Sequence, residues 1–202
     1  MLMTRRTRFP YQRHAVNIGR MTHDTPPLLP VRPRLRPVPA GDHHLPAIRG
    51  LYAPYVLHAR CSFEEEVPSL HEMGQRLQAV RAAGLPWLVV EEDGELLGYA
   101  YAVRYRARAA YRGTVENSVY VGAAHQGRGI GRLLLDAVID ECTRAGYEQM
   151  VAVVGDSANA GSLRLHQRAG FHEVGVLRGV GRKFGVALDT VLMQRALCPG
   201  PA

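Results

Sequence analysis

The chain has 202 residues, 47% of them hydrophobic, which suits one well-packed domain with an appendage and is short for two ordinary domains. Its formal net charge of +7 would favour a nucleic-acid ligand if it were spread along the chain, but residues 1–36 hold eight arginines and a single acid. In the rest of the chain the charges of 17 basic and 17 acidic side chains cancel, which argues against a basic, nucleic-acid-binding domain.

No apolar run approaches the roughly 20 residues of a membrane span, and the chain begins without the apolar core of a signal peptide. The three cysteines, Cys61, Cys142 and Cys198, are widely spaced and form no Cys-x-x-Cys pair, and no His cluster has metal-ligand spacing. We therefore expect a cytoplasmic protein without disulfides, bound metal or membrane contact.

Residues 1–33 combine arginines with prolines and show no sustained hydrophobic period, which predicts a disordered extension. The extension can be inert, can result from an over-extended translation start upstream of Met21, or can be a basic arm that binds RNA or a membrane. We assign it no function. The sequence then predicts one catalytic domain over residues 34–197 and a short tail over 198–202.

Hydrophobic periodicity predicts a short strand and two helices, followed by a hairpin that turns at Asp93-Gly94. In chain order these are a strand over 35–38, a helix with apolar residues from Leu45 to Val56 and Asp42 as its N-cap, a helix over 69–83 that ends at Gly84, and strands over 87–90 and 96–103.

The second half alternates strands with helices. The predicted elements are a strand over 114–121, a helix over 129–145 closed by Gly146, a strand over 149–154, a helix over 159–169 closed by Gly170, and strands over 171–177 and 188–195. This order predicts an α/β fold with a mixed, mostly antiparallel sheet, a central parallel βαβ portion and helices on both faces.

Residues 125–134 read HQGRGIGRLL and lie between a predicted strand and an amphipathic helix. Glycines let backbone amides crowd around an anion, and a helix N-terminus adds positive potential. The turn has neither the Gly-Lys-Ser/Thr of a P-loop nor the glycine frame of a dinucleotide fingerprint. Taken alone, it is equally typical of tight packing.

Two motifs in order resemble the GNAT N-acetyltransferases. Gln126-x-x-Gly129-x-Gly131 is similar to their pyrophosphate loop, and Asn159-x-x-Ser162-x-x-x-His166-x-x-x-Gly170-Phe171 is similar to their next motif. Residues 114–121 and 181–185 more narrowly resemble the phosphinothricin and methionine-sulfone type of amino-acid N-acetyltransferase, and this likeness covers residues 34–197. The resemblance implies the GNAT fold, acetyl-CoA as donor and a homodimer.

The resemblance also assigns the cofactor contacts. The backbone of Val119, Tyr120 and Val121 would pair with the pantetheine arm, the loop residues Gln126, Gly127, Arg128, Gly129, Ile130, Gly131 and Arg132 would cradle the pyrophosphate, and Asn159 and Ser162 would contact the cofactor further along. A strand edge that opens toward a helix N-terminus suits a linear ligand rich in amides.

Acetyl transfer to an amine needs a base, because an alkyl ammonium is protonated at neutral pH. Strand alternation puts Glu116 on one face of its strand with Ser118 and Tyr120, where partial burial would raise the pKa of its carboxyl. The pattern alone favours a solvent-facing strand residue at Glu116. The family has its catalytic acid at this place, which favours Glu116 as the general base.

His166 occupies a place where many relatives carry a tyrosine that protonates the departing thiolate, and an imidazole can donate that proton. The alternative is a histidine that only packs on its helix.

The acceptor is expected to contact a basic, aromatic loop just before the Glu116 strand. A guanidinium can hold a carboxylate in a bidentate pair and a tyrosine can wall a pocket, although loop arginines are often only solvated. The substrate-binding residues that the resemblance suggests are Phe63, Arg108, Ala109, Ala110, Tyr111 and Lys183. Phosphinothricin specialists carry a basic residue where this chain has Glu64, so acceptance of that substrate stays open.

The sequence therefore predicts an enzyme that moves an acetyl group from acetyl-CoA to the α-amine of a small amino-acid-like molecule. Two alternatives remain: acetylation of a protein N-terminus or lysine, and a non-catalytic CoA-binding module whose basic tail binds RNA.

Overall fold

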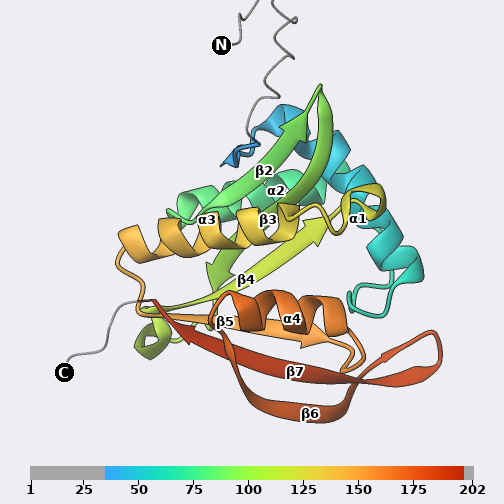
Figure 1. Ribbon diagram of the computed structural model, residues 1–202, viewed down its shortest axis with the longest axis vertical. Coiled ribbons are helices and arrows are strands. Elements are labelled where there is room, and N and C mark those ends of the chain that lie inside the picture. The colour runs from blue at the N-terminus through green and yellow to red at the C-terminus, as the bar shows by residue number, and fades with distance from the viewer. Residues whose placement is uncertain (1–34, 198–202) are drawn as a thin grey trace, which may run out of the picture. The chain divides into compact units, whose positions relative to one another are not determined.

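The structure is a computed structural model that describes residues 35–197 (Figure 1). The predicted N-terminal extension, the C-terminal tail and Cys198 lie outside the described residues. Within residues 35–197, no helix is long and apolar enough to cross a bilayer.

In this part of the chain seven strands form one sheet in the order β1-β2-β3-β4-β5-β7-β6. The strands are β1 (Val38–Pro39), β2 (Trp87–Glu92), β3 (Glu95–Arg104), β4 (Thr114–Val121), β5 (Gln149–Gly155), β6 (His172–Lys183) and β7 (Val186–Ala196). β4 and β5 pair in parallel and the other described neighbours pair antiparallel. The predicted mixed, mostly antiparallel sheet is confirmed.

Four α-helices cover the sheet: α1 (Leu45–His58), α2 (Leu70–Ala82), α3 (Ile130–Arg144) and α4 (Ala160–Arg168). In Figure 1, α3 and α4 lie in front of the strands, and α1 and α2 lie behind them. α3 is strongly amphipathic and buries Leu134, Leu135 and Val138 against one face. Tyr52 and Tyr55 of α1 pack edge-on against Tyr120 on the other face. Helices on both faces are therefore confirmed.

The parallel pair β4 and β5 separates part of the way along. The ladder runs from Thr114↔Gln149 to Asn117↔Ala152 and stops there, although both strands continue. β3 stays paired with β4 as far as Val121, and β7 stays paired with β5. The gap between β4 and β5, here called the fork, leaves one backbone edge of β4 without a strand partner among the described residues from Ser118 onward.

Three local predictions were wrong. Residues 35–37 are not a strand, and β1 comprises only Val38–Pro39. Asp42 does not cap α1, because a short 3-10 turn over Asp42–His44 intervenes and His44 is the N-cap; the Asp42 carboxylate instead pairs with Arg81 at 3.0 Å. β6 extends to Lys183 because the hairpin turns only at Phe184 and Gly185, which both have positive φ.

Candidate active site

A cavity of about 600 Å³ opens at the fork, between β4, the glycine turn, β5 and α4. Most residues expected to hold the cofactor line it: Val119, Tyr120, Val121, Gln126, Gly127, Gly129, Ile130, Gly131, Arg132, Asn159 and Ser162. His166 also lines it. Arg128 does not, because its guanidinium turns away to the Glu92 carboxylate at 2.7 Å.

The glycine turn offers its backbone to the cavity. Gly127 and Gly129 have φ of 77° and 83°, a left-handed conformation that suits glycine, and α3 begins directly after them. A Cβ on Gly131 would lie 3.4 Å from Leu165, so the turn also packs closely on α4. The Arg132 guanidinium is held by Asp136 at 2.6 Å and by the Arg168 carbonyl. The backbone amides at the start of α3 are therefore better placed to bind an anion than the arginine side chains are.

Tyr55 is a cavity residue that sequence reasoning recorded only as an apolar helix position. Its hydroxyl donates to the Val121 carbonyl at 2.6 Å and accepts from the Gln126 side chain at 3.5 Å. α1 thus links the end of β4 to the glycine turn, although Tyr55 and Val121 are 66 residues apart in the sequence. No local pattern signals such a contact.

Glu116 lies on β4 opposite Val103 of β3 and is partly buried. Within residues 35–197 its carboxylate forms no hydrogen bond or ion pair. Burial raises the pKa of this carboxyl, and the nearby Arg106 charge only partly opposes it. The carboxylate is therefore free to take a proton.

His166 is buried at the end of α4 nearest the fork. Its Nε2 lies 3.0 Å from Asn117 Oδ1, and its Nδ1 lies 2.9 Å from the Ser162 carbonyl and 3.3 Å from the Ser162 hydroxyl. Burial lowers the pKa of the imidazole, and the Ser162 carbonyl opposes that shift. The Phe171 ring packs edge-on against it at 5.1 Å.

The side chains of Glu116 and His166 lie on opposite faces of β4. Asn117 points toward α4, where it meets His166, whereas Tyr120 points toward α1. Strand alternation puts Glu116 on the Tyr120 side. β5 is still paired with β4 at Glu116 and Asn117 and separates just beyond them. Asn117 and His166 line the cavity, whereas Glu116 lies on the opposite face of β4 and does not line it.

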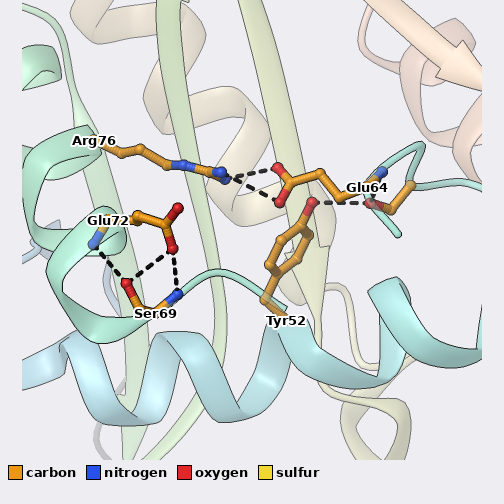
Figure 2. Close-up of polar contacts among 6 residues, drawn as sticks. Tyr52, Glu64, Ser69, Glu72 and Arg76 are labelled. Atoms are coloured by element: carbon orange, nitrogen blue, oxygen red, sulfur yellow. Dashed lines mark hydrogen bonds and ion pairs between the residues drawn. The ribbon is translucent and has the colours of Figure 1, made fainter. Parts of the chain in front are cut away.

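Phe63, expected to bind substrate, lies on the loop between α1 and α2 and does not line the cavity. Figure 2 shows how the loop is anchored: the Arg76 guanidinium meets the Glu64 carboxylate at 2.7 Å and 3.2 Å, and Tyr52 bonds to Ser62 at 2.9 Å. Glu64 is thus neutralised by Arg76. A Cβ on Gly181 would lie 2.6 Å from the Phe63 ring, so the β6 hairpin packs directly on this loop.

Lys183 is 2% exposed, and its ammonium donates to the carbonyls of Ser62 at 2.6 Å, Ala59 at 2.9 Å and Tyr55 at 3.5 Å. All three of its donors are used, so it holds the end of α1 and the Phe63 loop against β6. Lys183, expected to bind substrate, does not line the cavity and instead positions the loop that carries Phe63.

We expect Lys183→Met to lower the free energy of unfolding by about 3 kcal/mol, because it leaves buried carbonyls without their charged donor. Denaturant unfolding of the full-length protein measures this loss. The neighbouring exposed Arg182→Met is the matched control and should change stability little. Equal stability of the two variants would contradict the anchoring role.

The loop expected to hold the acceptor comes directly before β4 and contains a short 3-10 turn over Ala109–Tyr111. Tyr105 and Tyr111 pack edge-on at 5.8 Å, and the Arg106 guanidinium lies 4.9 Å from the Tyr105 ring centre. Arg108, Ala109, Ala110 and Tyr111 are exposed and do not line the cavity. They lie just before the start of β4, the strand that carries Glu116.

A free strand edge and a glycine turn at a helix start lie together at the cavity, an arrangement that suits a linear, phosphate-bearing ligand. A buried imidazole lines the same cavity, and the Glu116 carboxylate lies on the other face of β4. Residues 51–171 match the acetyltransferase (GNAT) family, and the chain belongs to that family. It is an N-acetyltransferase by the same evidence.

Two relatives and one solved structure indicate which N-acetyltransferases the chain is similar to. The chain is 52% identical to a phosphinothricin N-acetyltransferase of Alcaligenes faecalis, over 79% of this chain and 81% of the relative. It is 41% identical to an L-methionine sulfoximine/L-methionine sulfone acetyltransferase of Salmonella typhimurium, over 75% and 88%. A phosphinothricin acetyltransferase of Sinorhizobium meliloti, solved with acetyl-CoA, superposes with a TM-score of 0.77 at 37% identity, over 80% and 88%.

Proposed function

We propose that this enzyme acetylates the α-amine of a small amino-acid-like molecule, with acetyl-CoA as the donor. The observation that carries the proposal is the unpartnered edge of β4 beside the glycine turn. Its amides suit the pantetheine arm, and the start of α3 suits the pyrophosphate. When bound, acetyl-CoA supplies an activated acetyl group at the fork.

Two side chains share the proton transfers. Glu116 accepts a proton from the acceptor's ammonium, directly or through water, which leaves the amine free to attack. The raised pKa of the Glu116 carboxyl makes it a stronger base for this step. His166 in its imidazolium form gives one proton to the departing sulfur and returns to the neutral ring. Attack leaves a second proton on the nitrogen, and its loss recharges the His166 ring, directly or through solvent. The proton taken by Glu116 goes to solvent, so the transfer releases one proton overall and the site regains its starting state.

The acceptor lies on the Glu116 side, walled by Phe63 and Tyr111, with the loop guanidinium of Arg108 available for a carboxylate. The relatives act on phosphinothricin and on methionine sulfoximine or sulfone, which are amino acids with a tetrahedral polar end group. Because Arg76 neutralises Glu64, the acidic residue beside Phe63 presents no free negative charge to such a substrate. Both substrate types are therefore included in the proposal.

We expect free methionine sulfone, methionine sulfoximine and phosphinothricin to be acetylated with higher kcat/KM than peptides that carry a free N-terminus or a lysine. A thiol-release assay with acetyl-CoA and each amine measures this, with mass spectrometry to locate the acetyl group. A higher kcat/KM for the peptides would favour the protein acetyltransferase alternative. Acetyl-CoA binding without turnover of any amine would favour the CoA-binding module.

We also propose a homodimer in the cytoplasm. Exposed apolar side chains gather on the hairpin of β6 and β7, namely Val174, Leu177, Val180, Phe184 and Val186. A patch of this kind on a soluble enzyme is typical of a subunit interface.

A further inference from the structure

Asn117 is a buried polar residue at the point where β4 and β5 separate. Its side-chain amide spans the fork: Nδ2 donates to the Val151 carbonyl of β5 at 3.2 Å, and Oδ1 lies 3.0 Å from His166 Nε2 of α4. Both Asn117 and His166 line the cavity.

The neighbours of Asn117 fix which way its amide points. The Val151 carbonyl can only accept a hydrogen bond, so the NH₂ group must face it, and the opposite orientation would place two oxygens 3.2 Å apart. Oδ1 therefore faces the imidazole. Since an amide oxygen also only accepts, His166 must carry a proton on Nε2.

The other ring nitrogen has a partner for either protonation state. When Nδ1 is protonated it donates to the Ser162 carbonyl at 2.9 Å. When Nδ1 is bare it can accept from the Ser162 hydroxyl at 3.3 Å, but it then faces that carbonyl, which is also an acceptor. Without Asn117, that carbonyl would attract the single proton of a neutral ring to Nδ1. The ring neighbours Asn117, Ser162 and Phe171 on β4, α4 and the approach to β6 are all uncharged.

We propose that Asn117 is a positioning residue that holds a proton on Nε2 of His166 and fixes the ring at the fork. The catalytic meaning of this inference rests on the proposed function, in which His166 protonates the departing sulfur. Asn117 keeps the ring in one orientation. The proton that distinguishes imidazolium from the neutral ring is then gained and lost at Nδ1, where Ser162 offers its carbonyl to the protonated nitrogen and its hydroxyl to the bare one.

Nitrogen NMR tests the proton position without any turnover. Long-range ¹H–¹⁵N correlation of the full-length protein at mildly alkaline pH, with His166→Gln to assign the signals, should show a neutral His166 ring protonated on Nε2. The folded Asn117→Leu protein should shift toward the Nδ1-protonated form, and Asn117→Asp, which keeps an acceptor, should retain Nε2–H. An Nδ1–H ring in the wild type overturns the proposal without any variant, and so does an unchanged tautomer in folded Asn117→Leu.

Steady-state kinetics then separates the inference from the proposed function. Asn117→Leu should lower kcat about 10- to 100-fold with little change in KM for acetyl-CoA, since outright loss of a general acid costs about 100-fold or more. Asn117→Asp should recover part of this loss. If the tautomer shifts as expected while kcat stays at the wild-type value, positioning by Asn117 is supported and the acid role of His166 fails.

Discussion

Glu116→Gln should lower kcat/KM for a good acceptor at neutral pH by about 100- to 10,000-fold, the usual cost of losing a general base. Glutamine keeps the shape of the side chain and cannot take the proton. Acetyl-CoA affinity, measured by calorimetry, should barely change, because the cofactor edge of β4 begins beyond Glu116.

The same variant should not lose stability. A carboxyl whose pKa is raised on folding makes the folded state less stable as pH rises from its unfolded toward its folded pKa, and this cost persists at higher pH. Removal of the charge should therefore leave thermal stability at neutral pH equal or slightly higher. Glu173→Gln, on an exposed part of β6, is the matched control and should keep full activity. A destabilised Glu116→Gln protein would instead indicate a structural carboxylate.

Gly129→Val should abolish tight acetyl-CoA binding. Gly129 has φ of 83° at the start of α3, and a branched side chain in this left-handed conformation costs about 1–2 kcal/mol and projects into the phosphate cradle. The strain affects the free and the bound protein alike, so the loss of affinity comes from the blocked amides, and about 1.4 kcal/mol of lost contact already weakens binding tenfold.

Gly146→Val separates backbone strain from the binding effect. Gly146 closes the same helix with φ of 84° and has open space around it, so the two variants share the conformational penalty but only one touches the cavity. Calorimetry should show wild-type affinity for the Gly146 variant. Wild-type affinity in a folded Gly129→Val protein would contradict the cradle.

The cavity lining around the glycine turn could be predicted from sequence because the turn is a local feature. Glycines at 127, 129 and 131 must follow a strand and precede a helix to form an anion site, and all of that lies within a few neighbouring residues. The Asp93-Gly94 turn is predictable for the same reason, since both residues adopt the positive φ that their types favour.

The parts that sequence reasoning missed depend on distant partners. Lys183 was expected beside the substrate, yet its carbonyl partners lie 121 to 128 residues earlier in the chain. Asn117 and His166 are separated by 49 residues, and strand alternation shows only that Asn117 faces inward. Asp42 failed as a cap because the His44 ring accepts from the Gly41 amide and favours a 3-10 turn, a choice that cap preferences do not include.

The pH dependence of kcat/KM in wild type and Glu116→Gln is the most direct test of Glu116 as the general base. If Glu116 is the base, the ratio of the two rates is largest near neutral pH and narrows in alkaline solution, where the acceptor amine loses its proton without help. A ratio that stays constant across this range would contradict the account, because a carboxylate that only shapes the pocket affects protonated and free amine alike.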